Sequence, residues 1–195
     1  MKKIIIILII IFYNLNISVH ADDIKDFEIE GISVGDSLLD FLTSKKIKSS
    51  KRNYVKDKKY YAVGYDKNLK KYETVDIYLK SGDIKYTVVA IVGFKFINMN
   101  ECLNEKKVIV NQIKSIFTDS EISENPRVEH MYDKTGDSYE AQTNFLLNKD
   151  INDDHIRVGC TNWSEKITNE NNWADNLAIG VYSKEIQKWF IDGYN

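Results

Sequence analysis

The chain has 195 residues and is nearly balanced in charge, with 27 Lys and Arg against 29 Asp and Glu. The charges are well mixed along the chain, which argues against nucleic acid or an anionic membrane surface as the partner, because both require a basic face. Hydrophobic residues make up 43% of the chain and aromatic residues 12%, which suffices for the core of one ordinary domain.

Segment 1–21 has the pattern of a cleavable secretory signal peptide. A short basic start precedes an apolar run at 4–13, and Val19 and Ala21 occupy positions −3 and −1 of a cleavage site. The apolar run is about half of the roughly 20 residues that a membrane-spanning helix needs, so a permanent N-terminal anchor is the weaker alternative. We expect the mature protein to begin at Asp22 and to be released into the periplasm or the medium, with no stable membrane anchor.

The first half of the mature chain predicts one helix followed by three strands. Apolar residues at helical spacing indicate the helix at about 34–44, and the polar, basic stretch 45–59 is predicted to be a solvated loop. Alternating apolar residues predict strands at 60–66, 72–80 and 84–96. In the last of these strands the even-numbered residues from Tyr86 to Phe96 share one face, and Gly93 indicates a bulge or bend.

The second half repeats this order. A helix at about 99–118 precedes strands at 138–148, 155–164 and 176–182, and a last helix opens at Ser183. The stretches 119–137 and 165–175 are polar and are predicted to be loops. The order is therefore helix–three strands, helix–three strands, helix. Because short turns join adjacent strands, we predict one α+β domain at 22–195, an antiparallel sheet of about six strands with helices packed on one face.

The mature chain has two cysteines, Cys102 and Cys160. In an oxidising compartment an even pair usually forms a disulfide. Cys102 lies on the apolar stripe of the helix at 99–118, and Cys160 lies on the apolar face of the strand at 155–164, so both sulfurs face the same layer if the helix packs on the sheet. The alternative is two buried free thiols, which Cys tolerates as a small hydrophobe.

One motif resembles an enzyme family. Gly35-Asp36-Ser37-Leu38 matches the sequence block that names the GDSL-type esterases, in which the serine attacks an acyl carbonyl and a D-x-x-H motif supplies the base. Here the stretch that ends in His155 begins with Asn152 where that motif has Asp, and the family's Gly and Asn blocks have no visible match. An esterase that acts through Ser37 and His155 is therefore the alternative function.

No cofactor or metal is indicated, because His130 and His155 lack the spacing of metal ligands. Trp173 lies in the polar, Asn-rich loop at 168–176, and we expect its ring to be exposed and to contact a ligand by stacking. Since no coherent catalytic set is visible, the leading hypothesis is a non-enzymatic binding or interaction module whose partner is a protein or a small molecule.

Several stretches together resemble a family of small exported proteins from AT-rich marine bacteria. They are 26–40, 83–86 leading to Gly93, Glu101-Cys102, 157–164 and 183–189. The resemblance spans nearly the whole mature chain, and the family has no assigned function, so it lends no catalytic residues. It implies that the two cysteines and the turn at 31–37 belong to the family pattern.

Overall fold

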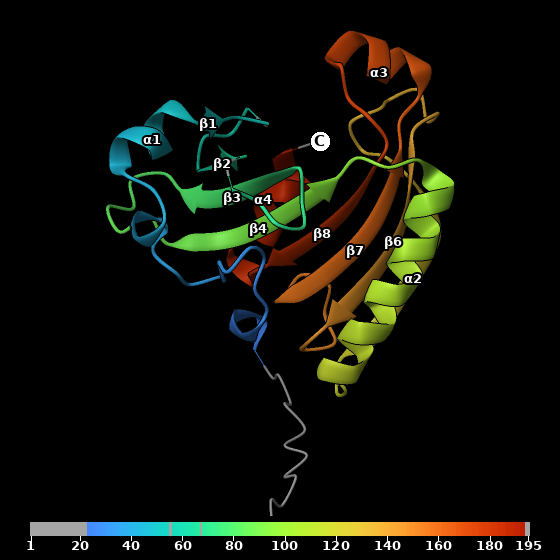
Figure 1. Cartoon of the computed structure of the whole chain (residues 1–195), viewed down its shortest axis with the longest axis horizontal. Coiled ribbons are helices and arrows are strands. Elements are labelled where there is room, and N and C mark those ends of the chain that lie inside the picture. Colours follow the sequence, from blue (N-terminus) through green and yellow to red (C-terminus); the bar gives the residue numbers. More distant parts are fainter. Residues whose placement is uncertain (1–22, 55, 67, 194–195) are drawn as a thin grey trace, which may run out of the picture.

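The protein folds around one antiparallel sheet. The computed structural model describes residues 23–54, 56–66 and 68–193. The predicted signal peptide at 1–21 and the predicted mature start at Asp22 lie outside these residues. The described strands follow the order β1-β2-β3-β4-β8-β7-β6-β5, and every neighbouring pair is antiparallel. Figure 1 shows α2 in front of the sheet and α4 behind it.

The predicted α+β class with an antiparallel sheet is confirmed, although the described sheet has eight strands rather than six. The strands are β1 (Lys51–Arg52), β2 (Tyr60–Tyr65), β3 (Thr74–Lys80), β4 (Val88–Lys95), β5 (Glu121–Glu129), β6 (Tyr139–Leu146), β7 (His155–Asn162) and β8 (Asn176–Tyr182). The α-helices are α1 (Ser44–Ser49), α2 (Met99–Ile116), α3 (Glu165–Asn171) and α4 (Lys184–Gly193), and two short 3-10 helices, η1 (Ile24–Asp26) and η2 (Leu38–Asp40), precede them.

The two halves of the sheet are four-stranded meanders that meet where β4 pairs with β8. α2 follows β4 and packs over β7 and β8 before the chain reaches β5 at the far edge. Each half thus has one strand more than predicted. The additional strands, β1 and β5, are the two edges of the sheet, and none of their residues is buried. They therefore lack the alternation of apolar residues that predicts a strand from sequence.

The predicted helix at 34–44 is wrong. Residues 23–43, called the N-terminal arm from here on, run along the sheet in turns, extended segments and the two 3-10 helices. The N–H group of Gly35 donates to Val88 O at 2.8 Å, and the φ angle of Gly35 is +97°, which is incompatible with a right-handed helix. Because the arm packs on the sheet, five of its apolar residues are buried (Ile24, Ile29, Ile32, Val34 and Leu38), whereas Leu39 and Phe41 are exposed. The helix forms later, as α1, which begins at Ser44, continues into the predicted loop 45–59 and buries Ile47.

The sheet has two faces of different character. The α2 face is apolar across most of the sheet, and the N-terminal arm, α1 and α2 cover it. On the opposite α4 face a second apolar cluster forms, in which Tyr60, Tyr78 and Val92 pack against Ile186 and Trp189 of α4. The prediction that the helices pack on one face is therefore wrong. The apolar stripe of α4 packs on the other face, because it covers the tyrosines of β2 and β3, which would otherwise be exposed to solvent.

The structure also corrects the predicted alternation in β4. Leu79 pairs with Val88 whereas Tyr78 pairs with Ala90, so Val89 is an extra residue in the ladder. This bulge turns Val88 to the α2 face, while Ala90 and Val92 point to the α4 face. The bulge therefore lies at Val89. Gly93, where the sequence indicated a bulge or bend, has a different role.

Candidate functional site

A cleft of about 870 Å³ opens on the α2 face, between the N-terminal arm and α2. Leu177 and Ile179 of β8 form its floor, Ile109 and Ile113 of α2 form one wall, and Phe27 of the arm lies opposite. The volume is within the roughly 300–1,000 Å³ of small-molecule sites, which are also lined mainly by apolar side chains. The cleft is therefore the candidate binding site.

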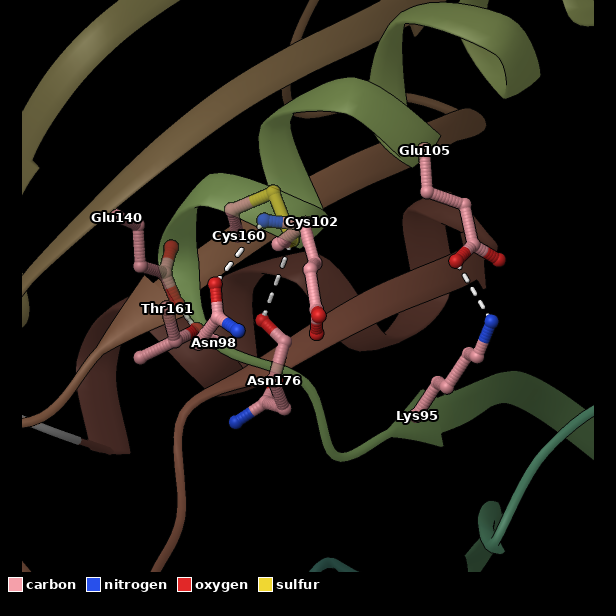
Figure 2. Close-up of a disulfide and its surroundings, with 9 residues drawn as sticks. Lys95, Asn98, Cys102, Glu105, Glu140, Cys160, Thr161 and Asn176 are labelled. Atoms are coloured by element: carbon pink, nitrogen blue, oxygen red, sulfur yellow. Dashed lines mark hydrogen bonds and ion pairs between the residues drawn. A yellow bond between two sulfur atoms is a disulfide. The ribbon is translucent and has the colours of Figure 1, made fainter.

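The wall formed by α2 is fixed at its N-terminal end. Cys102 in the first turns of α2 and Cys160 of β7 form the predicted disulfide, with Cα atoms 5.8 Å apart, as Figure 2 shows. Both cysteines are fully buried, and Asn98 caps the helix by accepting the Glu101 N–H at 3.1 Å. Because the disulfide joins α2 to the sheet, α2 cannot move away from the floor at this end without breaking a covalent bond.

Gly93 shapes the cleft by making room for Tyr72. A Cβ atom on Gly93 would lie 2.7 Å from the Tyr72 ring, so only glycine lets this ring lie across β4 beside the floor. Among the described residues, the Tyr72 hydroxyl has no hydrogen-bond partner. Burial, followed by the negative charges of Glu30 and Glu105, raises the pKa of Tyr72 to about 12. The hydroxyl therefore stays protonated at neutral pH and can serve a ligand as donor and acceptor.

Three of the charged side chains that line the cleft, those of Lys95, Glu105 and Glu30, have partners within the protein. Lys95 Nζ and Glu105 Oε2 form an ion pair at 2.6 Å between the end of β4 and α2, which Figure 2 shows. The Glu30 carboxylate accepts the backbone N–H groups of residues 70–72 at 2.7–3.3 Å. Burial raises the pKa of Glu30, but these bonds and the charge of Lys70 outweigh it and lower the pKa overall. The charged side chains that line the cleft are nearly balanced in sign, four carboxylates against three lysines, which leaves no strong preference for a charged ligand.

Ser37 takes part in the local structure of the arm. Its hydroxyl donates to Lys85 O at 2.8 Å and accepts the Leu39 N–H at 3.3 Å, which caps η2. His155 at the start of β7 is fully buried. Among the described residues, no hydrogen bond joins Ser37 and His155. The esterase alternative thus stays a prediction without an observation in its favour.

The His155 ring is held in a buried polar contact. Its Nδ1 lies 3.1 Å from Asp153 O, and Gln187 Nε2 lies 2.7 Å from its Nε2. Burial, reinforced by the positive charge of Arg157, lowers the pKa of His155 to about 4 despite the bond to Asp153. The ring is therefore neutral at pH 7, donating to Asp153 O and accepting from Gln187.

Trp173 belongs to an aromatic cluster with Trp163, Tyr132 and His130. The centroid of its ring lies 4.8 Å from that of Trp163 and 4.6 Å from that of Tyr132, and the His130 ring lies 4.2 Å from Trp163. Trp173 is half-buried, so it is less exposed than the sequence indicated. Its role in ligand contact stays a prediction.

The sequence reasoning missed the residues of the cleft. Ile109 and Ile113 lie within the predicted helix at 99–118 and Tyr72 begins the predicted strand at 72–80, but neither pattern indicates a ligand site. One signal was present, because a glycine inside a strand pattern can mark a close approach by another group, and Gly93 is approached by Tyr72.

Comparison with known proteins adds no assignment, since no family model, curated protein or solved structure matches this chain. Within the described residues, no group of three or more His, Cys, Asp or Glu side chains could hold a metal ion. None of the described helices is both long and apolar enough to cross a membrane.

Proposed function

We propose that the protein is an exported binding module that takes a small, largely apolar ligand without net charge into the cleft between the N-terminal arm and α2. The observation that carries this proposal is the cleft itself, with its floor at Leu177 and Ile179 and its wall at Ile109 and Ile113. A hydrogen-bonding group on the ligand pairs with the Tyr72 hydroxyl. The nearly balanced charges at the rim, four carboxylates against three lysines, favour an uncharged ligand because they attract neither sign strongly.

Export is the second part of the proposal. The signal-peptide pattern at 1–21 supports it, and the Cys102–Cys160 disulfide is in keeping with an oxidising compartment. Intact-mass analysis of protein recovered from the native periplasm or medium should give a chain that begins at Asp22. Mature material that begins at Met1 would contradict export through a cleavable signal peptide.

Binding is tested with N-phenyl-1-naphthylamine, a neutral apolar fluorophore that brightens in apolar surroundings. We expect saturable binding of one molecule per chain. Gln112 is exposed and lines the cleft, so Gln112→Trp narrows the cleft without disturbing the core. This substitution should weaken binding at least tenfold.

The matched control is Asn111→Trp, which adds the same side chain at an exposed position on the same helix that does not line the cleft. It should leave the affinity within a factor of two of the wild-type value. Fluorescence that rises without saturation, or equal losses of affinity in the two variants, would overturn the assignment of the cleft as the binding site.

A further inference from the structure

The second half of the α4 face carries a patch of polar side chains where the first half carries apolar ones. Strand register places this polar patch in three rows across β6, β7 and β8. The rows are Glu140, Thr161 and Asn176; then Gln142, Gly159 and Ala178; then Asn144, Arg157 and Gly180. Gly159 therefore lies at the centre, with polar residues on its own strand and on β6.

Glu140 is the negative group of the polar patch, and the protein already satisfies it. Its Oε1 pairs with His130 Nε2 at 3.2 Å and accepts the Thr161 hydroxyl at 3.4 Å, while Oε2 accepts the amide of Gln142. Burial alone would raise the pKa of Glu140, but His130, Gln142 and the charge of Arg157 together lower it to about 2. Glu140 is thus a fixed anion at neutral pH.

Arg157 is oriented but has no carboxylate partner. Its Nε donates to Asn144 Oδ1 at 2.8 Å, and the guanidinium carbon lies 5.7 Å from the centroid of the Tyr182 ring. Among the described residues, Arg157 forms no ion pair, and its two Nη atoms have no hydrogen-bond partner. A guanidinium presents its donors as a planar fork that matches a carboxylate. The fork of Arg157 is therefore held in place and unoccupied by the protein's own groups.

Open space lies next to this arginine. A Cβ atom placed on Gly159 would meet no atom within 4 Å, although strand register sets Gly159 between Gln142 and Ala178. A second, independent feature is Asn176, which is 6% exposed and whose Oδ1 has no hydrogen-bond partner among the described residues. Such orphaned buried acceptors are uncommon and call for an explanation. A ligand over Gly159 that carries a hydrogen-bond donor would provide the missing partner of Asn176 Oδ1.

We propose that the polar patch is a second binding site, for a small organic carboxylate whose carboxylate group binds the Nη atoms of Arg157 and whose body lies over Gly159. The remainder of the ligand offers a donor to Asn176 Oδ1 and an acceptor to Gln142. This site lies on the opposite face of the sheet from the cleft, and it stands or falls independently of the function proposed for the cleft.

The test uses ¹⁵N-labelled protein titrated with succinamate, which carries one carboxylate and one amide, and, at equal ionic strength, with succinamide as the uncharged analogue. Succinamate should give saturable chemical-shift changes at the Gly159 and Gln142 amides and at Arg157 Nε–H, and succinamide should not. Gly159→Leu fills the open space without a backbone penalty, because Gly159 does not have a positive φ, and it should abolish the changes. Arg157→Gln should weaken succinamate binding at least tenfold.

Arg127→Gln is the matched control, because Arg127 in β5 also lies over a tyrosine, at 3.8 Å from the ring centroid of Tyr139, but outside the polar patch. Its succinamate affinity should equal that of the wild type. Shifts that grow linearly with concentration, equal shifts with succinamide, or unchanged affinity in Arg157→Gln would each overturn the proposal. If Gly159→Leu alters the fold, the ligand affinity of Arg157→Gln decides whether the proposal holds.

Discussion

The two faces of the sheet differ in what lies beside the apolar surface that the helices cover. On the α2 face the covering elements leave a cleft over an apolar floor that includes Leu177 and Ile179. On the α4 face the cover stops with α4, and beyond it the strands carry hydrogen-bonded polar side chains such as Glu140 and Arg157. An uncovered apolar floor is suited to an apolar ligand, whereas an uncovered polar network is suited to a charged one. The same sheet therefore offers two chemically distinct surfaces.

The most severe test of this comparison removes the main anchor of α4. Trp189 is 5% exposed, its ring lies 5.6 Å from that of Tyr60, and its indole N–H donates to Asp57 O at 3.1 Å. Trp189→Ala should lower the free energy of unfolding by about 3–5 kcal/mol, because a large buried aromatic is lost and a cavity is left. Urea unfolding measures the change. A loss below about 1 kcal/mol would show that α4 does not close the first half of this face.

The next largest effect concerns the α2 face. Replacing both Cys102 and Cys160 by Ala should lower the free energy of unfolding by about 2–4 kcal/mol, since the bond closes a long loop and restricts the unfolded chain. The single substitutions serve as controls and should cost about as much as the double one, because either removes the same bond. Unfolded, non-reduced wild-type protein that shows two reactive thiols per chain would contradict the disulfide.

A third prediction uses the buried histidine of the α4 face. The pKa of His155 is lowered to about 4, whereas it is about 6.5 in an unfolded chain. Between these values the unfolded state binds a proton that the folded state does not, so stability is complete above pH 6.5 and falls as the pH drops to 4. The loss should be on the order of 2–3 kcal/mol.

Urea unfolding at pH 7 and pH 4.5 checks this prediction on the wild type and on His155→Gln. The variant keeps a polar group near Gln187 but cannot titrate, so its stability should fall less over the same interval. Equal losses in the two proteins would show that His155 is not buried in its neutral form.

The smallest effect is expected at the rim of the cleft. Lys95 and Glu105 are paired at 2.6 Å, but their side chains are 34% and 37% exposed. Solvent screens such a pair, so Glu105→Gln should change the free energy of unfolding by less than about 1 kcal/mol. It should also leave N-phenyl-1-naphthylamine binding within a factor of two, because the proposed ligand is uncharged. A large loss of affinity would mean that the rim charge takes part in binding.

Much of the fold could be predicted from the sequence, because the inner strands and α2 bury apolar residues with clear periodicity. The ranges of β2, β3, β6, β7 and β8 agree with the predicted strands to within two residues at each end. The edge strand β5 could not be predicted, since none of its residues is buried. The N-terminal arm gave the opposite error. Val34, Leu38 and Phe41 have helical spacing, but the positive φ angle of Gly35 keeps this segment out of an α-helix, and Phe41 is exposed.

The candidate sites were less accessible to sequence reasoning, because both depend on which elements cover which face. The cleft lies where α2 and the N-terminal arm are separated over the sheet, and the local sequence of either element does not predict this separation. Likewise, Arg157 is notable only because it lies two residues from Gly159 on the same face of β7 and forms no ion pair among the described residues. The disulfide was predictable because the chain has only two cysteines, which allow one intramolecular pairing, and begins with a signal-peptide pattern that predicts an oxidising compartment.

The most direct test of the central claim, that the cleft on the α2 face is the binding site, is chemical-shift mapping of N-phenyl-1-naphthylamine on ¹⁵N-labelled protein. The largest changes should fall on the residues that line the cleft, at Phe27, Tyr72, Ile113 and Leu177, with little change on the α4 face around Gly159. Changes centred on the α4 face, or scattered over exposed apolar residues such as Ile84, would contradict the account.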